Sequence, residues 1–240
     1  MLSIVIPTLN EEKLLEQTLT ALRELRHLKY EIIVSDGGSN DSTLEIAGRF
    51  ADTVVVHTGS YRQKIGQGKN AGAAAASGDY LVFLDADVVI PEISGFFTQA
   101  VELFENDPRL LGLTVFLKVF PETATRADHI VFWAVNRIVQ FSNNFLHWGG
   151  APGEFQMVRA DAFRKVGGYN EILVVDEDQE MFFGLSKIGK TRVDSRLFVL
   201  HTARRAHAIG WPKLVWLWTI NLVYTKARRR SFTKEWEVIR

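Results

Sequence analysis

The chain lacks cysteine, an excess of either charge and an apolar run long enough to cross a membrane. The absence of cysteine from all 240 residues excludes a disulfide scaffold, a thiolate zinc site and a cysteine nucleophile. Lys+Arg and Asp+Glu each number 28, so no chain-wide positive field attracts nucleic acid, and we expect no nucleic-acid partner. The apolar and aromatic segment 211–224 covers about 14 residues, whereas a bilayer-spanning helix needs about 20.

The composition that remains is that of an ordinary folded protein. Hydrophobic residues make up 47% and charged residues 23% of the chain, which is enough to form a core without covalent staples. The length favours one α/β domain with a few appended elements. The chain starts directly with the apolar run Leu2–Ile6 and has no basic segment before it. We therefore expect no signal peptide and a cytoplasmic location.

The first half of the chain alternates strand-like and helix-like segments. Strands are expected over Leu2–Ile6, Glu31–Ser35, Thr53–His57 and Tyr80–Leu84, with helices over Glu11–Leu25, Asp41–Phe50 and Gly68–Ala76. This order predicts parallel strands with helices on both faces, and right-handed crossovers place the strand C-termini at one edge. Ligands of such folds bind at that edge.

The pattern changes after Pro91, and no internal repeat or low-complexity linker follows. We expect a helix over Ile93–Phe104, a strand or strand pair over Leu111–Phe120 and an aromatic-rich stretch over Thr123–Leu146. A helix over Asp178–Lys187 and a strand over Leu197–Leu200 are expected to follow.

The sharpest local motif is Asp85-Ala86-Asp87, directly after the fourth expected strand. Where the backbone turns at a strand end, both carboxylates can approach one centre. Carboxylate oxygens suit Mg²⁺ or Mn²⁺, which commonly also bind substrate phosphates. Taken alone, the motif is equally typical of a solvated turn with a capping Asp.

Two further motifs follow the first and second strands at the same edge. Asp36 precedes Gly37-Gly38 and can accept hydrogen bonds from a ribose or base, although Asp-Gly is also a common turn. The segment from Pro7 to Glu12 places the start of a helix at the same edge of the sheet. Taken alone, this segment indicates no more than a capped helix.

The segment Gly66-Gln67-Gly68-Lys69-Asn70-Ala71 has the spacing of a dinucleotide-binding fingerprint. It does not follow the first strand, and the first strand–helix turn has no glycine, which argues against a dehydrogenase. Lys64 and Lys69 could meet a phosphate here or be solvated surface lysines.

The last candidate groups lie in the second half of the chain. Glu177 and Asp178 lie at the start of an expected helix, where a negative charge is favoured. A carboxylate there can act as a general base, but acidic residues that merely cap the helix give the same pattern. His201 follows a strand, and Arg204-Arg205 follow it; imidazole is a metal ligand, and guanidinium grips phosphate oxygens.

Together these segments resemble glycosyltransferase family two, whose members have the GT-A nucleotide-sugar fold. The resemblance covers the chain from Leu2 to Trp211. It rests on the ordered segments Ile4–Glu12, Ile33–Thr43, Lys69–Gly72, Ala76–Asp79, Asp85–Asp87, Val166–Glu171 and Glu177–Glu180. The Gln-x-x-Arg-Trp signature of processive members is absent as such, which argues against a polymerising synthase.

The resemblance implies a fold and a division of the chain. It implies an α/β GT-A Rossmann-like fold with a mainly parallel central sheet flanked by helices, plus a C-terminal aromatic and basic amphipathic helix. Residues 1–210 would form the catalytic domain, with 1–90 the nucleotide-binding half and 91–210 the acceptor-binding half, and 211–240 a helical tail.

The resemblance also implies roles for individual residues. Asp178, with Glu177 beside it, matches the family's catalytic base. Asp85 and Asp87 match the metal-binding pair, with His201 as a further ligand of Mn²⁺ or Mg²⁺. The expected donor-binding residues are Pro7, Leu9, Glu11, Asp36, Lys69, Asp85, Ala86, Asp87, Arg204 and Arg205.

The implied activity is metal-dependent, inverting transfer of a sugar from a UDP- or GDP-sugar to an acceptor hydroxyl or a lipid-linked phosphate or glycan in cell-envelope or glycan biosynthesis. The alternatives are a non-catalytic sugar-nucleotide-binding protein and a sugar-1-phosphate nucleotidyltransferase. The second would need a glycine-rich first loop, which Pro7–Glu12 does not provide.

The tail has a composition of its own. Segment 211–224 contains three tryptophans, and Lys213, Lys226 and Arg228–Arg230 flank it. This pattern predicts either a helix at the headgroup level of a membrane, with peripheral attachment to the cytoplasmic face, or a helix that simply packs on the domain.

Overall fold

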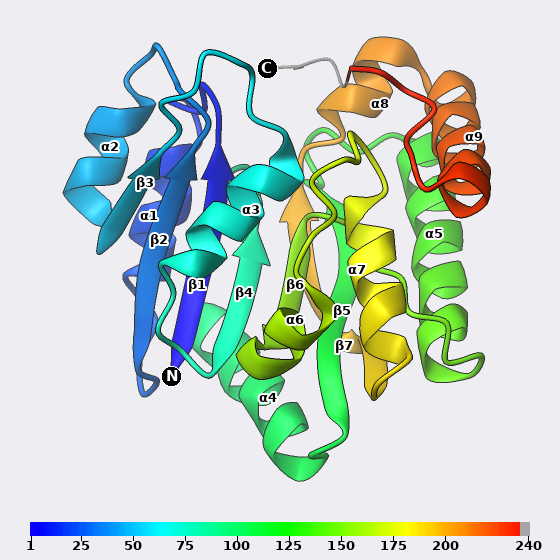
Figure 1. Ribbon diagram of the computed structural model, residues 1–240, viewed down its shortest axis with the longest axis horizontal. Coiled ribbons are helices and arrows are strands. Elements are labelled where there is room, and N and C mark those ends of the chain that lie inside the picture. Colours follow the sequence, from blue (N-terminus) through cyan, green and yellow to red (C-terminus); the bar gives the residue numbers. More distant parts are fainter. Residues whose placement is uncertain (236–240) are drawn as a thin grey trace.

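The computed structural model describes residues 1–235 and shows a seven-stranded sheet with helices on both faces (Figure 1). The sheet order is β3-β2-β1-β4-β6-β5-β7. The strands are β1 (Leu2–Thr8), β2 (Tyr30–Asp36), β3 (Thr53–Val56), β4 (Tyr80–Leu84), β5 (Leu110–Val119), β6 (Phe155–Arg159) and β7 (Lys190–His201). The helices are α1 (Leu15–Leu22), α2 (Thr43–Phe50), α3 (Ile65–Ala74), α4 (Ile93–Asn106), α5 (Arg126–Asn144), α6 (Ala160–Val166), α7 (Glu177–Ser186), α8 (Arg204–Ile209) and α9 (Trp211–Arg228).

The pairing confirms a mainly parallel sheet. β1 pairs in parallel with β2 and β4, β2 with β3, and β5 with β7, whereas β6 runs antiparallel between β4 and β5. The register sets Thr8 opposite Asp36, so the ends of β1 and β2 lie side by side. Because β6 runs the other way, its first residues lie at the edge where the parallel strands end. This edge therefore gathers chain segments from both halves of the molecule.

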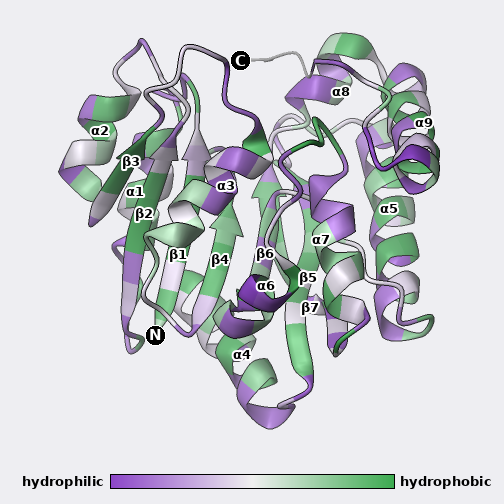
Figure 2. Cartoon of the chain, in the orientation of Figure 1, coloured by the Kyte–Doolittle hydropathy of each residue, from purple (hydrophilic) through white to green (hydrophobic). Residues whose placement is uncertain are grey.

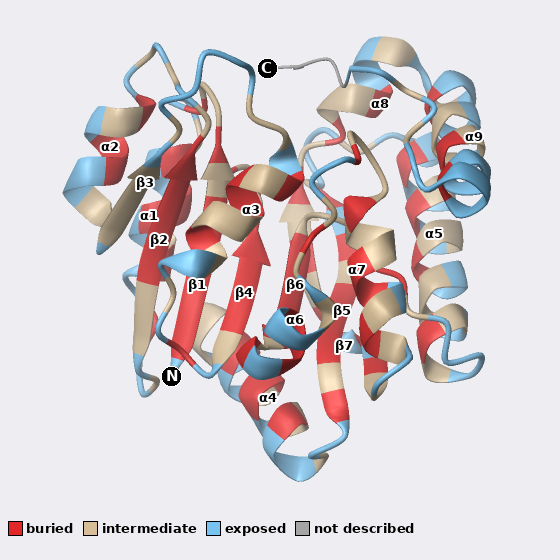
Figure 3. Ribbon diagram, in the orientation of Figure 1, coloured by how far each residue is buried: buried red, intermediate tan, exposed pale blue. Residues whose placement is uncertain are grey.

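Alternation along the buried strands supplies two helix layers. Ile4 and Ile6 belong to the core cluster that includes α1, α2 and α4, whereas Val5 belongs to the one that includes α6 and α7. This is the period-two pattern of a strand that is buried on both faces. Gly72 of α3 makes close packing possible, because a Cβ at that position would lie 2.4 Å from Val5 Cγ1. The burial colouring in Figure 3 shows the central strands as continuously buried.

The third group of helices, α5, α8 and α9, lies beside the β5–β7 end of the sheet (Figure 1). Asp128 of α5 is fully buried and joins all three, since its carboxylate accepts hydrogen bonds from His207 Nε2 at 2.9 Å and Trp211 Nε1 at 2.7 Å. Among residues 1–235, no helix combines the length and apolarity that crossing a membrane requires. The expected tail includes residues 236–240, which lie outside the described part of the chain.

Several boundaries differ from those expected from the sequence. The first helix begins at Leu15 rather than Glu11, because Asn10 has φ 55° and the Glu11 amide donates to Thr43 Oγ1 at 2.8 Å. Strand β6 was not expected, and β7 extends over 190–201 rather than 197–200. The aromatic-rich stretch 123–146 contains one long helix, α5, and the tail forms a helix that continues to Arg228.

Candidate active site

The C-terminal edge of the sheet brings together charged residues from three distant segments, all singled out from the sequence. Asp85 follows β4, Asp178 lies in the first turn of α7, and Lys69 of α3 lies between them. The Lys69 Nζ is 2.7 Å from Asp178 Oδ1, and the same ammonium interacts electrostatically with Asp85. Asp178 thus lies close enough to Asp85 to act on its pKa, although 92 residues separate the two in the sequence.

Asp178 is held by two donors on one of its carboxylate oxygens. Oδ1 accepts hydrogen bonds from Lys69 Nζ at 2.7 Å and from Gln156 Nε2 at 2.9 Å. Oδ2 faces Gly153, where a Cβ would lie only 2.7 Å from it. The carboxylate is thus fixed through one oxygen, and the absence of a side chain at residue 153 leaves space at the other.

The amide of Gln156 has one orientation because of Tyr169. The Tyr169 hydroxyl donates to Gln156 Oε1 at 2.5 Å, so the amide nitrogen is the atom that faces Asp178. Both side chains are almost completely buried. A buried phenol and a buried amide therefore orient the acid, and neither was recognised from the sequence.

Lys69 is a buried cation rather than a solvated one. Its side chain is 1% exposed and lies 5.1 Å from the centre of the Tyr169 ring. Burial alone would lower its pKa, but the carboxylates of Asp178, Asp85 and Glu177 raise it. The surface interpretation of Lys69 is wrong, while its expected contact with the donor stays a prediction.

The acids at this edge outnumber the neighbouring cations, Lys69 and Arg204. Burial, together with the charges of Asp87, Glu154 and Asp178, raises the pKa of Asp85 well above its usual value despite Lys69. Burial likewise raises the pKa of Glu154, and burial and Asp178 raise the pKa of Glu177 to about 8. A cluster of partly desolvated carboxylates of this kind favours a bound cation.

Asp87 lies against the segment that follows β7. Thr202 Oγ1 donates to Asp87 Oδ2 at 2.7 Å, and Arg204 Nη2 lies 3.3 Å from the same oxygen. Arg204 also reaches Glu11 Oε1 at 3.1 Å, which joins the β1 and β7 ends across the site. Its partly buried guanidinium has a raised pKa, because Asp87 and Glu11 outweigh the effect of burial. Arg205 follows on the same helix and is partly buried.

Asp36 organises the turn after β2. It is fully buried, and its carboxylate accepts hydrogen bonds from the Gly38 and Ser39 amides at 2.9 and 2.8 Å and from the Thr8 and Ser39 hydroxyls. The turn lies beside Leu9, which a Cβ at Gly37 would approach to 3.7 Å, and Pro7 lies near Gly68 of α3. The roles of Pro7, Leu9 and Asp36 in donor binding stay predictions.

The residues present fit a divalent cation in their chemistry. Asp85 and Asp87 offer carboxylate oxygens, and His201 Nε2 is buried without a hydrogen-bond partner in residues 1–235. The other ring nitrogen of His201 lies 3.9 Å from Glu154 Oε1, and Phe132 packs edge-on against the ring. In that described part of the chain no three His, Asp or Glu side chains converge closely enough to form a complete metal site. The assignment of Asp85, Asp87 and His201 as ligands stays a prediction.

Four groups of the site were missed from the sequence: Gly153, Glu154, Gln156 and Tyr169. The first three come from the loop before β6 and from β6 itself, a strand that was not expected. Glu154 O accepts from the Asp85 amide at 3.2 Å, which fixes this loop to the Asp85 turn. The available signal was the Pro152-Gly153 break followed by Phe155–Arg159, a short run with alternating apolar residues. Ala86, in contrast, is buried as part of the turn, and its carbonyl accepts from Thr18.

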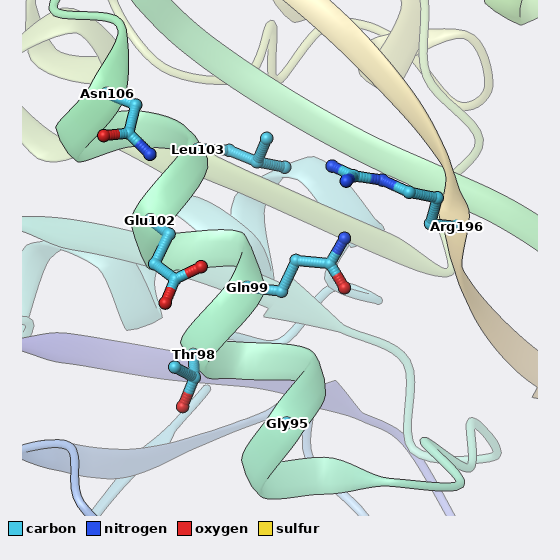
Figure 4. Close-up of a pocket in the computed structure, with 7 residues that line it drawn as sticks. All are labelled: Gly95, Thr98, Gln99, Glu102, Leu103, Asn106 and Arg196. Atoms are coloured by element: carbon cyan, nitrogen blue, oxygen red, sulfur yellow. The ribbon is translucent and has the colours of Figure 1, made fainter.

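A surface hollow elsewhere on the molecule is separate from this site. It measures about 650 Å³ and lies between α4 and β7, where Gln99 and Arg196 face one another (Figure 4). None of the residues that line it belongs to the acids at the sheet edge.

The sheet topology, the Asp-x-Asp turn after β4 and the acid at the start of α7 together define a glycosyltransferase of the GT-A fold class. The chain belongs to glycosyl transferase family 2, which matches residues 3–167. The resemblance and the fold class expected from the sequence are confirmed, and the protein is an enzyme of this class.

Known relatives and solved structures agree with this assignment. Succinoglycan biosynthesis protein ExoA of Rhizobium meliloti is 27% identical to this chain and aligns with 96% of it and 70% of ExoA. Mannosyltransferase PcManGT from Pyrobaculum calidifontis, solved with GDP-Man and Mn²⁺, has a TM-score of 0.73 at 19% identity and covers 95% of this chain and 64% of its own. TarS 1–349 of S. aureus, solved with UDP-GlcNAc, has a TM-score of 0.69 at 17% identity and covers 98% of this chain and 68% of its own.

Proposed function

We propose that the protein transfers a sugar from a nucleotide-sugar donor to an acceptor hydroxyl of a growing glycan, with inversion of configuration and with a divalent metal. The observation that carries the proposal is the position of Asp178, which Lys69 connects to Asp85 at the C-terminal edge of the sheet. The names of its relatives support glycan biosynthesis as the setting, since ExoA is a succinoglycan biosynthesis protein.

Asp178 is suited to the role of general base. Its Oδ1 is occupied by Lys69 and Gln156, so its Oδ2, beside Gly153, is the oxygen that can accept a proton. In the transfer step the acceptor oxygen bonds to the anomeric carbon while the bond from that carbon to the diphosphate oxygen breaks. The acceptor proton moves to Asp178, and the nucleoside diphosphate leaves with the electron pair. A single displacement of this kind inverts the anomeric centre.

The opposite side of the site is suited to the leaving group. Asp85 and Asp87 would hold the metal ion, which when bound neutralises charge on the diphosphate. Arg204 lies beside Asp87 and supplies a guanidinium in the same region. The structures of PcManGT with GDP-Man and Mn²⁺ and of TarS with UDP-GlcNAc support a nucleotide sugar as the donor.

The variant Asp178→Asn tests the role of the base. It keeps the shape of the side chain and an oxygen for Lys69 and Gln156, but it cannot take up the acceptor proton. We expect transfer to fall by about 10²–10⁴-fold, as for removal of a general base, while binding of a UDP- or GDP-sugar with Mn²⁺ changes little. The measurements are product formation by NMR, which also gives the anomeric configuration, and donor binding by calorimetry.

The exposed Asp161 at the start of α6 provides the control, since Asp161→Asn makes the same chemical change away from the site. Full transfer activity in Asp178→Asn would contradict the proposed base and would indicate an acceptor that is already ionised, such as a phosphate. Retention of configuration would contradict the single displacement. Binding of sugar nucleotides by the native chain without any turnover would instead favour the non-catalytic binding protein.

A further inference from the structure

Helix α5 has the reverse of the usual polarity of surface helices. The buried side of α5 carries Asp128, Asn136 and Asn143 together with a single large apolar residue, Phe132. Its outward side carries Ile130, Trp133, Ile138, Phe141 and Phe145. Ile130, Trp133 and Phe145 are 67%, 65% and 70% exposed, respectively. These positions fall on one face at the helical period, so they form an apolar stripe, which the exposed Arg137 interrupts between Trp133 and Phe141.

Helix α9 shows this reversal in part, since its inner side also packs Trp211, Leu214 and Trp218 against the core. Two of its three buried residues are Asn221 and Thr225, whereas Trp216 and Val223 are 55% and 62% exposed. The buried polar groups are satisfied, since Asn221 hydrogen-bonds to Leu217 O and Thr233, and Thr225 hydrogen-bonds to Asp176. The buried position of these polar residues is therefore compatible with stable packing, and the apolar residues Trp216 and Val223 lie on the outer side of α9.

The two helices form one face at the same edge of the molecule (Figures 1 and 3). At one end Trp211 of α9 donates to Asp128 of α5, and at the other Lys226 of α9 lies 5.5 Å from the ring centre of Trp148, just beyond α5. Figure 2 shows hydrophobic residues alternating with hydrophilic ones along both helices at this edge. We call this surface the α5–α9 face. Exposed apolar area of this extent on a folded protein indicates a binding surface.

Basic residues outnumber acids around the α5–α9 face, although the whole chain is neutral. Segments 126–148 and 211–235 contain eight Lys or Arg residues and two acids, the buried Asp128 and Glu235, whose carboxylate pairs with Arg62. The basic residues are Arg126, Arg137, Lys213, Lys226, Arg228, Arg229, Arg230 and Lys234. The opposite charge excess lies elsewhere on the molecule. A partner for this face must therefore be both apolar and negatively charged.

We infer that the α5–α9 face docks on the surface of an anionic lipid bilayer. The apolar stripe would enter the boundary between headgroups and acyl chains, and Trp133 and Trp216 would lie at the headgroup level, where tryptophan is favoured. The flanking Lys and Arg residues would contact anionic headgroups. A second copy of the chain fits less well, since a twofold interface would bring the two basic rims together.

This docking goes beyond sugar transfer and also bears on the acceptor. The buried side of α9 packs against the loop before α7, because Thr225 Oγ1 donates to Asp176 Oδ2 at 3.1 Å and Ser231 Oγ accepts from the Val174 and Val175 amides. Asp178 follows this loop directly. A bilayer bound to the outer side of α9 would thus lie about 10 Å from this loop, the diameter of one helix, within reach of the headgroup of a lipid-linked acceptor. That consequence rests on the proposed function, whereas the docking itself does not.

Co-sedimentation with vesicles tests the docking without using activity. The native chain should bind vesicles of equal parts phosphatidylcholine and phosphatidylglycerol, bind phosphatidylcholine vesicles far less, and release from the anionic vesicles as salt is raised. The triple variant Trp133→Ser, Phe141→Ser, Phe145→Ser removes exposed side chains only and should lower the partition coefficient by at least about tenfold. The matched control replaces the exposed Val56, Tyr61 and Ile65 by Ser on the β3–α3 side of the molecule.

A second pair of variants isolates the charge. Arg228→Gln, Arg229→Gln, Arg230→Gln should weaken binding and flatten its salt dependence, whereas Lys13→Gln, Arg26→Gln, Lys29→Gln, with the same loss of charge on another surface, should not. Tryptophan emission should shift to the blue on vesicle binding, and less so in Trp133→Phe. Three results would overturn the inference. The first is absence of vesicle binding by the native chain, and the second is an equal loss of vesicle binding in a triple variant of the face and in its matched control. The third is a lipid-free dimer of the native chain that the Trp133/Phe141/Phe145 triple variant dissociates. Circular dichroism verifies that each variant is folded.

Discussion

At the residue scale, the orientation of Asp178, the proposed base, depends on its neighbours Lys69, Gln156 and Tyr169. Tyr169 orients Gln156, and Gln156 with Lys69 fixes one oxygen of Asp178. The Tyr169–Gln156 bond is buried and the two bonds to Asp178 are partly buried, so the loss of one partner leaves a largely desolvated polar atom unsatisfied. The arrangement keeps the carboxylate in one rotamer before the acceptor arrives, which is the preorganisation that proton transfer requires.

We predict that Tyr169→Phe lowers kcat about tenfold while the donor KM stays nearly unchanged. The reason is that Gln156 Oε1 loses its donor, at a cost of about 1–2 kcal/mol, and the amide no longer has a single orientation toward Asp178. Steady-state kinetics with varied donor gives the two constants. Tyr80→Phe is the control, because Tyr80 packs against Phe104 at the other end of β4. A rise in the donor KM with an unchanged kcat would argue against an orienting role.

At the scale of elements, one carboxylate joins three helices. Asp128 closes the capping box at the start of α5 with Thr125 and accepts hydrogen bonds from His207 of α8 and Trp211 of α9. Against the cost of burial, these donors lower the pKa of Asp128 to about 2. The pKa of Asp128 is lower in the folded state than in the unfolded state. The ionised carboxylate therefore contributes fully to the free energy of unfolding above about pH 4, and this contribution is lost as the pH falls through about 2.

We predict that Asp128→Asn lowers the free energy of unfolding by about 2 kcal/mol at pH 7, a value that follows from the depressed pKa. The difference between native and variant should shrink as the pH falls from about 4 to about 2, since protonation removes the same charge from the native chain. Urea unfolding at several pH values measures it. Glu105→Gln on the exposed side of α4 should show neither effect. A difference that stays constant down to pH 2 would mean that the carboxylate charge is not the stabilising feature.

At the scale of the whole molecule, the site depends on both halves of the sheet. Lys69 and Asp85 come from the first 90 residues, whereas Gln156, Asp178 and Arg204 come from the rest, and β4 and β6 pair directly between the two. A ligand that bridges these groups would therefore stabilise the entire fold. The assignment of 1–90 to nucleotide binding and 91–210 to acceptor binding stays a prediction.

We predict that UDP or GDP raises the melting temperature in the presence of Mn²⁺ and has much less effect after addition of EDTA. Without the cation, the diphosphate would lie beside the surplus of carboxylates around Asp85, and like charges repel. Binding at 100 times the dissociation constant stabilises the native state by about 2.7 kcal/mol. Differential scanning fluorimetry measures the shift, with adenosine diphosphate as the ligand control. An equal shift with and without EDTA would contradict metal-assisted binding.

The class of the fold can be predicted from local patterns alone. Short β-rich runs that alternate with helix formers predict parallel strands, and a strand end predicts where polar groups gather, because both depend on local periodicity and chain direction. Asp85 and Asp87 were singled out in this way, and Asp178 by its position at the start of an expected helix.

Local patterns do not predict how those acids are held or which surface stays exposed, because both depend on contacts between distant segments. Gln156 and Tyr169 reach Asp178 across separations in sequence that no local pattern encodes, and Lys69 became a buried partner only because α3 packs closely against β1. The apolar residues of α5 have the spacing of a core-facing stripe, yet they point outward because Asp128, Asn136 and Asn143 are satisfied within the fold. Periodicity shows that a helix has two faces, but the hydrogen-bond partners available inside the fold decide which face is buried.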